Sequence, residues 1–377
     1  MDSLCLLVPR KRRRLALVVG LDAVGDFIIW MQYGAAEISR FARGSDRKVM
    51  LLANRAWAAY AQTTGLWDGV LEVEPASFVN HPWYRLRVLL RIRRLGAELL
   101  IQPRAARFFL LEDCIARTCG AHARIGNAGT LLNLKPWQRR VGNGFYSRVI
   151  EVNDDNSVHA LHRHSQFASA LTGQATVRAK LPRPRSSSPT GAVVVALGAG
   201  DAGRVWPIEK LAAVIRHVVN NHPGHPVRLY GLAADIETSR RLETLVGARL
   251  ENMVGRTPLQ EFVAAIADAK LTICNESSAY HIAMAYDTPV LCFLGGGHYG
   301  QFAPYPRTGR GPSRAAVLSV AMECYGCNWN CRYERGRSEA YPCVGSISAD
   351  SALAAVDGLL AADRRPIRGA RQANDGV

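Results

Sequence analysis

The sequence predicts an α/β protein whose two halves each contain a parallel sheet and face each other across a cleft. In both halves, short apolar stretches alternate with amphipathic stretches of helical period, which is typical of a parallel sheet with crossover helices. A segment rich in proline and serine, residues 183–191, separates the halves and can continue neither a helix nor a central strand. The length of 377 residues suits two domains of ordinary size.

We therefore expect an N-terminal domain over 1–182, a linker over 183–191, a C-terminal domain over 192–363 and a polar tail over 364–377. Eight strands are expected, at Leu15–Gly20, Lys48–Ala53, Gly69–Val73, Glu98–Gln102, Ala192–Leu197, Pro226–Tyr230, Lys270–Cys274 and Pro289–Leu294. One helix is expected over Phe27–Phe41, and another begins at Trp206-Pro207. Thr257, Pro258 and Gln260 have the spacing of a capping box at the start of a further helix.

The charge of the chain favours an anionic partner. Its formal net charge is +16, only six of its 47 basic residues are lysines, and arginines concentrate at 10–14 and 85–94. Codon bias in a GC-rich genome is the alternative explanation, and the absence of a nucleic-acid-binding motif argues against nucleic acid.

The sequence contains no apolar run that would span a membrane, and Asp22 and Asp26 interrupt the only stretch that resembles a secretory signal. We expect a cytoplasmic protein attracted to phosphate or to an anionic membrane surface.

The loop after the first expected strand places polar groups at the cleft. Ligands of parallel sheets bind beyond the carboxyl ends of the strands, and Gly25 and Asp26 lie there. Gly25 lets another group approach the backbone closely, and Asp26 would direct its carboxylate into the cleft. The alternative is that Asp26 only caps the following helix.

Two loops of the C-terminal half have the composition of anion sites. Gly198 and Gly200 precede Arg204 at the start of a helix, and Glu276, Ser277 and Ser278 precede a helix that carries His281. Free backbone N–H groups at helix starts, together with a permanent cation, suit phosphate groups. Because both loops follow strands of one sheet, they predict a diphosphate pocket, although a plain turn and a core histidine are the alternatives. A further glycine-rich loop, 295–300, follows the next strand.

Four cysteines near the C-terminus have metal-ligand spacing. Cys324, Cys327, Cys331 and Cys343 can close one tetrahedral site for Zn or Fe. In a cytoplasmic chain a metal is favoured over disulfides, and reduced thiols or a partial redox pair are the alternative.

These motifs together resemble glycosyltransferase family 9, the heptosyltransferases of bacterial lipopolysaccharide core. The resemblance is carried by Asp22, Gly25 and Asp26, by Arg204-x-Trp206-Pro207, by Asn275-Glu-Ser-Ser-x-x-His281-x-Ala283-x-Ala285, by Thr288-Pro289-Val290 and by Pro304-Tyr305. It implies a GT-B fold of two Rossmann-like domains, with the acceptor mainly in the first and a nucleotide-diphosphate sugar, ADP-heptose favoured, in the second.

The resemblance also implies roles for single residues. Asp26 matches the catalytic base of an inverting transfer, with Asp22 and Gly25 on the acceptor side. Arg204 matches a cation on the donor phosphates, so catalysis requires no cofactor, and a metal at the cysteines is a structural clip. The other residues implied at the donor are Gly198, Gly200, Asp235, Glu237, Thr257, Glu276, Ser277, Ser278 and His281. The acceptor is a lipopolysaccharide or a related glycolipid or glycan, and the protein is peripheral at the inner face of the inner membrane.

Two departures from the family pattern keep other functions open. The family loop reads Asp-Ser/Thr-Gly where this chain has Glu276, Ser277 and Ser278. The longer carboxylate and the added side chain indicate an altered donor sugar or reduced activity. The alternatives are a protein-directed heptosyltransferase and a non-catalytic nucleotide-sugar-binding or assembly protein. A nicotinamide-dependent enzyme is disfavoured, because neither half has a Gly-x-Gly-x-x-Gly turn with an acidic residue about twenty residues further on.

Overall fold

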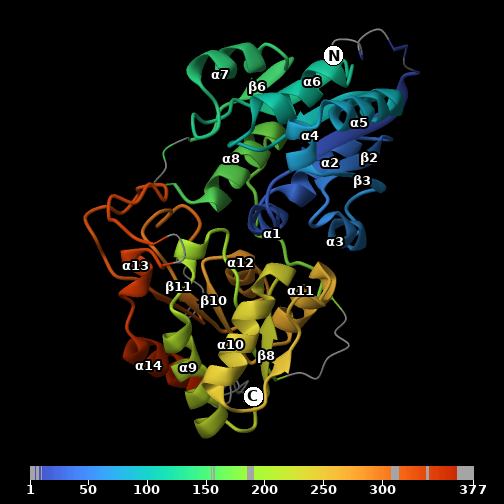
Figure 1. Cartoon of the computed structure of the whole chain (residues 1–377). Helices are drawn as coiled ribbons and strands as arrows, with labels where there is room; N and C mark the ends of the chain where they lie inside the picture. The colour runs from blue at the N-terminus through green and yellow to red at the C-terminus, as the bar shows by residue number, and fades with distance from the viewer. Residues whose placement is uncertain are drawn as a thin grey trace, which may run out of the picture.

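The chain folds into two α/β lobes, each built on a six-stranded parallel sheet (Figure 1). The structure is a computed structural model, and it describes residues 5, 8–9, 11–153, 155, 158–184, 191–306, 314–336 and 339–362. The tail 364–377 and most of the expected linker lie outside these residues. Among the described residues, none of the helices combines the length and the apolar character needed to cross a bilayer.

The N-terminal lobe has the strand order β3-β2-β1-β4-β5-β6. Its strands are β1 (Arg13–Gly20), β2 (Lys48–Asn54), β3 (Gly69–Val73), β4 (Ala97–Gln102), β5 (Ala123–Asn127) and β6 (Arg148–Ile150). Its helices are α1 (Val24–Gln32), α2 (Ala35–Arg43), α3 (Ala58–Thr63), α4 (Pro75–Asn80), α5 (Pro82–Leu95), α6 (Cys114–Thr118), α7 (Pro136–Asn143) and α8 (Ala160–Thr172), and a π-helical turn, η2, covers Phe109–Asp113.

The C-terminal lobe repeats this topology as β12-β11-β10-β7-β8-β9. Its strands are β7 (Val193–Ala196), β8 (Val227–Tyr230), β9 (Glu251–Asn252), β10 (Leu271–Asn275), β11 (Val290–Phe293) and β12 (Ala315–Leu318). Its helices are α9 (Ile208–Asn221), α10 (Ile236–Val246), α11 (Leu259–Ala267), α12 (Ser278–Ala285), α13 (Pro342–Gly345) and α14 (Ala349–Ala362), with short 3-10 turns at Ala202–Arg204 (η3) and Ala233–Asp235 (η4).

All eight expected strands form, because each is an apolar run that becomes buried between helices. Two local expectations are wrong. The helix expected over Phe27–Phe41 is split into α1 and α2, because Gly34 has φ +126°, which breaks the helical path. The expected capping box also fails: Thr257 Oγ1 donates to the carbonyl of Met253 at 3.0 Å, and Pro258 occupies the N-cap of α11 without a side-chain bond.

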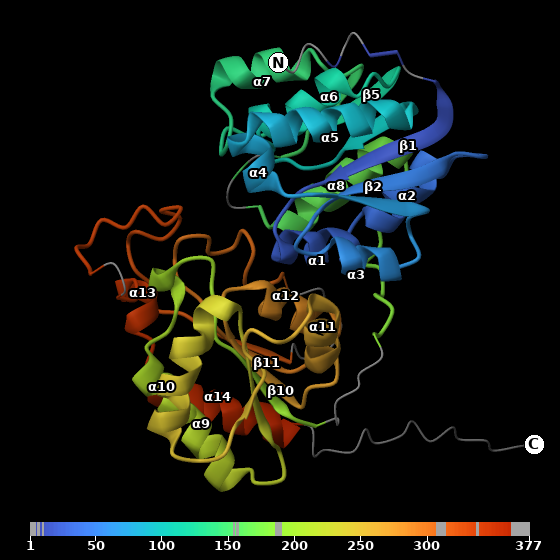
Figure 2. The same cartoon turned by 45° about the vertical axis from the view of Figure 1, so that its right-hand side comes forward.

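The two lobes contact each other directly. Helix α1 of the upper lobe packs on α12 of the lower lobe, and Figure 2 shows this contact from a second direction. The Tyr60 and Tyr286 hydroxyls lie 2.9 Å apart across it, and Ala160 N donates to the carbonyl of Gln301 at 2.7 Å. The loops that follow β1 and β10 are therefore held against each other.

Candidate active site

The point at which the strand order reverses in the N-terminal sheet carries a buried ion pair. The order reverses between β1 and β4, and the carboxyl ends of these strands lead to Asp22 and to Arg104. Arg104 pairs with Asp22 and, at 2.8 Å, with Glu112. Burial raises the pKa of Asp22 to about 7, although Arg104 acts to lower it. Two carboxylates therefore share one guanidinium beside the loop that holds Asp26.

Asp26 lies in the first turn of α1 and does not cap this helix, whose N-cap is Ala23. Its side chain lines a pocket of about 260 Å³. Burial raises the pKa of Asp26, and the positive charges of Arg104 and Arg163 oppose the rise. A carboxylate with raised proton affinity, open to a pocket, is a group suited to accept a proton.

The C-terminal sheet carries the matching ion pair at its own reversal point, between β7 and β10. Arg204 contacts the Glu276 carboxylate at 3.3 Å, donates to the Glu276 carbonyl at 2.9 Å and lies over the Trp329 ring at 4.7 Å. Burial raises the pKa of Glu276 to about 7, against the lowering effect of Arg204. Glu276 Oε2 is buried and has no hydrogen-bond partner among the described residues.

His281 joins the two halves of the site. A Cβ on Gly25 would lie 2.9 Å from His281 Cδ2, so only a glycine at 25 lets the α1 loop approach the imidazole so closely. Burial lowers the pKa of His281 to about 3, and the ring is therefore neutral at physiological pH. Its Nδ1 is buried without a hydrogen-bond partner in the described part of the chain. Asp26 and His281 thus come from different lobes to one place.

The pocket has walls from both lobes. The N-terminal lobe contributes Asp22, Asp26, Arg104 and Arg163, and the C-terminal lobe contributes His298, Gln301, Phe302 and Asn328. His298 comes from the glycine-rich loop 295–300 that follows β11. Sequence reasoning missed Arg104, although the signal was present: Arg104 follows the fourth strand, where the rule of strand carboxyl ends places a ligand-facing residue.

The remaining expected donor residues fall into two groups. Ser277 caps α12 and Ser278 begins it, both partly exposed beside Glu276, and a Cβ on Gly200 would lie 3.2 Å from Arg204 Nη1. Farther along the sheet edge, a Cβ on Gly198 would lie 3.0 Å from Asp235 Oδ2. Glu237 points into solvent toward Arg240, at 3.7 Å, and Thr257 turns back to its own loop. The structure therefore places Gly200, Ser277 and Ser278 near Arg204 and Glu276, whereas Glu237 lies outside this group.

The four cysteines of the C-terminal cluster are all free thiols. Gly296 N donates to Cys343 Sγ at 3.4 Å. Burial raises the pKa of Cys343, Gly296 opposes the rise, and the charges of Cys324, Cys327 and Cys331 add to it. In the conformation described, no three of these sulfur atoms come within 4.8 Å of one another.

Comparisons with known proteins show which family and which solved structures this chain is similar to. Residues 141–327 match the family model of glycosyltransferase family 9 (heptosyltransferase). Lipopolysaccharide heptosyltransferase 2 of Salmonella typhimurium is 29% identical over 94 residues, which are 24% of this chain and 26% of that protein. The aligned segment thus spans about a quarter of the length of this curated relative.

Solved structures establish the fold. The Escherichia coli ADP-heptose lps heptosyltransferase II superposes with a TM-score of 0.67 at 16% identity, covering 93% of this chain and 99% of that one. The dodecameric iron-containing heptosyltransferase TibC of enterotoxigenic E. coli, solved with ADP-D-beta-D-heptose, superposes with a TM-score of 0.54 at 13% identity, covering 94% and 78%. The resemblance drawn from the sequence is confirmed: residues 141–327 are similar to glycosyltransferase family 9, and the chain has the GT-B fold of the heptosyltransferase structures.

Proposed function

We propose that this protein transfers a sugar, with ADP-heptose favoured as the donor, to a hydroxyl group of a lipopolysaccharide or related glycan acceptor, with inversion at the anomeric carbon. One observation carries the proposal: Asp26 of the N-terminal lobe opens into a pocket whose other wall belongs to the C-terminal lobe, and the neighbouring Gly25 lies against His281 of that lobe. The donor is supported by the relatives, since structural neighbours of this chain are named for ADP-heptose or were solved with it.

In the proposed reaction the acceptor oxygen attacks the anomeric carbon while Asp26 accepts its proton. The bond between the anomeric carbon and the diphosphate oxygen breaks, and its electron pair leaves with the diphosphate. Arg204 and the free N–H groups at the start of α12, beside Ser277 and Ser278, stabilise the negative charge that develops there. These fixed positive groups supply the stabilisation that a divalent cation gives in other transferases, so we assign no cofactor to the reaction.

His281 and Glu276 would contact the donor sugar in this scheme. Because its pKa is about 3, His281 acts as a neutral hydrogen-bonding group rather than as a proton donor. Glu276, the family departure, is held by Arg204 with one carboxylate oxygen unpaired among the described residues, and its pKa of about 7 lets it donate or accept a hydrogen bond near neutral pH. We infer that Glu276 selects among donor sugars.

A screen for ligand-induced stabilisation tests this function. We expect ADP-heptose to raise the midpoint of thermal unfolding, because a ligand that binds only the folded chain stabilises it. NAD⁺ should have no effect. Stabilisation by NAD⁺ and not by any nucleotide-diphosphate sugar would contradict the proposal, and no stabilisation by either would favour a non-catalytic assembly protein.

We propose that one surface of the protein contacts the membrane that carries the acceptor. Six of the twelve exposed large apolar side chains in the described part of the chain come from two segments, 108–110 and 131–141. We call them the apolar surface: Phe108, Leu110, Leu131, Leu132, Trp137 and Val141. The segments are joined by the Phe109–Trp137 ring contact at 5.5 Å, and Leu132 also lines the pocket that holds Asp26.

The charge around the apolar surface suits anionic lipid. Residues 103–148 contain eight basic residues and only two acidic ones, Glu112 and Asp113, both of which are buried. The exposed charges of this segment are therefore all positive: Arg117, Lys135, Arg140 and Arg148. In the other basic segment, Arg85 and Arg93 bond to backbone carbonyls while Arg87, Arg91 and Arg94 are exposed along α5. Apolar side chains within a basic rim are typical of a peripheral membrane contact.

Vesicle binding checks this surface. We expect the W137S/V141S variant to bind phosphatidylglycerol-rich vesicles about tenfold more weakly than the wild type, because two apolar groups no longer enter the interface. The control is V177S, which removes a valine that is 72% exposed and lies outside the apolar surface. Equal binding by W137S/V141S and V177S would rule the surface out.

We propose that the four cysteines of the C-terminal cluster bind a structural metal ion, which we call the metal clip. Four thiols that influence one another, one of them already bonded to a backbone N–H group, form a donor set suited to Zn or Fe. The sulfur atoms would have to close in from the conformation described. An iron-containing structural neighbour supports the idea.

Metal analysis of the purified chain tests the clip. We expect about one thiolate-bound Zn or Fe per chain, lost in the C324S/C327S/C331S variant together with part of the thermal stability. Wild-type protein without thiolate-bound metal would end the proposal.

A further inference from the structure

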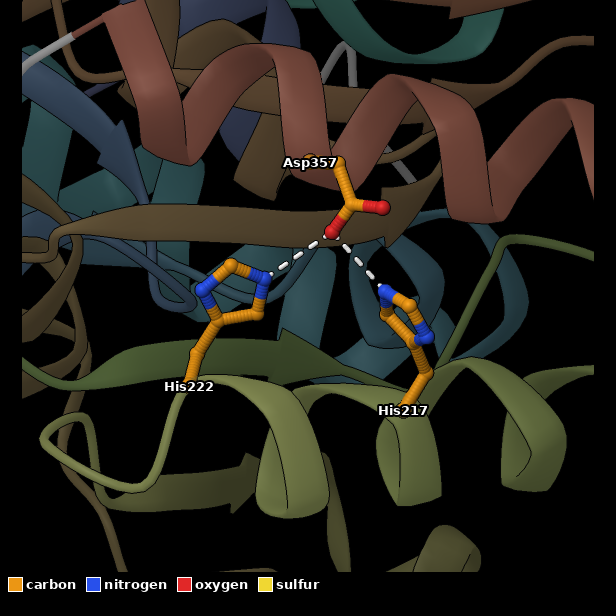
Figure 3. Close-up of side chains that lie close together, drawn as sticks. All are labelled: His217, His222 and Asp357. Carbon is orange, nitrogen blue, oxygen red and sulfur yellow. Dashed lines mark hydrogen bonds and ion pairs between the residues drawn. The ribbon is translucent and has the colours of Figure 1, made fainter.

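The structure brings two histidines and an aspartate together on the C-terminal lobe, away from the pocket. His217 lies on α9, His222 is the C-cap residue of the same helix, and Asp357 lies on α14 (Figure 3). Both Nε2 atoms approach the same carboxylate oxygen, Asp357 Oδ1, at 2.8 Å and 2.9 Å. The three potential ligand atoms all lie within 4.8 Å of one another, the only such group of three or more among the described residues.

We propose that His217, His222 and Asp357 form a divalent-metal site, for Zn²⁺ or a similar ion, that fastens α14 to α9. Two imidazoles and a carboxylate are a donor set that zinc uses, with water as the fourth ligand. Ligands at about 2.0–2.2 Å from a tetrahedral ion lie about 3.3 Å from one another. Binding therefore needs each Nε2 atom to move from its present distance of 2.8 Å or 2.9 Å from Asp357 Oδ1 to about 3.3 Å.

The groups around the imidazoles allow the change of tautomer that binding requires. Each Nε2 must release its proton to solvent before it can bind the ion, and Nδ1 takes up a proton, so that the ring stays neutral. His217 Nδ1 lies 2.9 Å from the Asn221 side-chain amide, which can turn its oxygen toward an Nδ1–H group, the second contact that metal-bound histidines usually have. His222 Nδ1 has no partner among the described residues, so no contact at that atom opposes its protonation when Nε2 turns from Asp357 to the ion.

The location assigns the ion a structural role. Arg204 and Trp206 precede the N-terminal end of α9, whereas the histidines lie at its C-terminal end. At 1.5 Å per residue the helix separates these ends by about 20 Å, so an ion here would not reach the donor. The Asp357 side chain is half-exposed, which gives the ion an entry path and leaves room for a water ligand.

Zn²⁺ titration in a background without the cysteine cluster tests the site. In the C324S/C327S/C331S variant we expect one Zn²⁺ to bind per chain and to raise the midpoint of thermal unfolding. Adding D357N should weaken binding at least about tenfold and abolish the shift. The matched control is D350N, which removes the same charge from an exposed position of the same helix.

Co²⁺ provides an independent reading, because a site of nitrogen and oxygen donors gives a cobalt spectrum without thiolate charge-transfer bands. Circular dichroism first establishes that each variant is folded. The proposal is overturned if the C324S/C327S/C331S variant binds no Zn²⁺, or if the D357N and D350N variants bind it equally well.

Discussion

Replacing Asp26 by Asn is expected to lower kcat by a factor of about 10²–10⁴ while leaving donor affinity unchanged, because the amide cannot accept the proton of the acceptor hydroxyl. The structure supports this choice, since Asp26 opens into the pocket and burial raises its pKa. The pH profile supplies a second reading. Asp26 is active in its ionised form, so wild-type kcat/KM should rise with pH through an apparent pKa above the usual carboxylate value near 4, and this limb should disappear in D26N. Transfer is measured as nucleotide release.

The matched control for D26N is D46N, at an exposed aspartate that pairs with Arg14 outside the pocket. D46N should keep wild-type turnover. If D26N also keeps near wild-type turnover, Asp26 is not the base, and Asp22, whose pKa is about 7, becomes the carboxylate to examine.

Replacing Arg204 by Ala is expected to reduce kcat/KM by about 10²–10³ and to weaken donor binding, since the cation that contacts Glu276 is lost. Stability should also fall, by about 1–3 kcal/mol at neutral pH, because the buried Glu276 carboxylate loses its partner. Arg204 lowers the pKa of Glu276, so without it that pKa rises above about 7. A folded-state pKa above the unfolded value makes the variant lose stability as pH rises.

The double variant R204A/E276Q separates the two roles of Arg204. A neutral amide at 276 needs no cation, so the double variant should recover stability and lose the added pH dependence while remaining inactive. Recovery of both stability and turnover would mean that Arg204 only neutralises Glu276 and does not act on the diphosphate.

The sequence predicts most of the fold because the strands are buried runs with unambiguous composition. Strands β5, β6, β9 and β12 were not expected, since they are short or carry charged and small residues such as Arg124, Gly126 and Arg148. The division of α1 from α2 at Gly34 was missed for another reason. A glycine inside a helical pattern is ambiguous until its surroundings are known, and here α8 packs so closely that a Cβ would lie 3.1 Å from Ala168 Cβ.

A site residue could be predicted from the sequence where the composition of one short stretch was enough to indicate it. Asp26, Arg204, Ser277 and His281 each lie in, or within one helical turn of, a loop whose composition marks it. Arg104 and Arg163 act through partners distant in sequence: Arg104 meets Asp22 only because β1 and β4 are neighbours, and Arg163 reaches the pocket from α8. The pairing of one arginine with a carboxylate at the reversal point of each sheet is therefore a property of the topology, which no single stretch of sequence displays.

Equilibrium binding of ADP-heptose to three proteins, measured by calorimetry, tests the central claim most directly. The account predicts that the wild type and D26N bind with the same dissociation constant, since Asp26 acts on the acceptor, and that R204A binds at least about tenfold more weakly. Two results would contradict the account: the same dissociation constant for all three proteins, or a larger loss of affinity in D26N than in R204A. Either result would mean that the donor does not bind to the C-terminal lobe, or that Asp26 of the N-terminal lobe is not the proton acceptor.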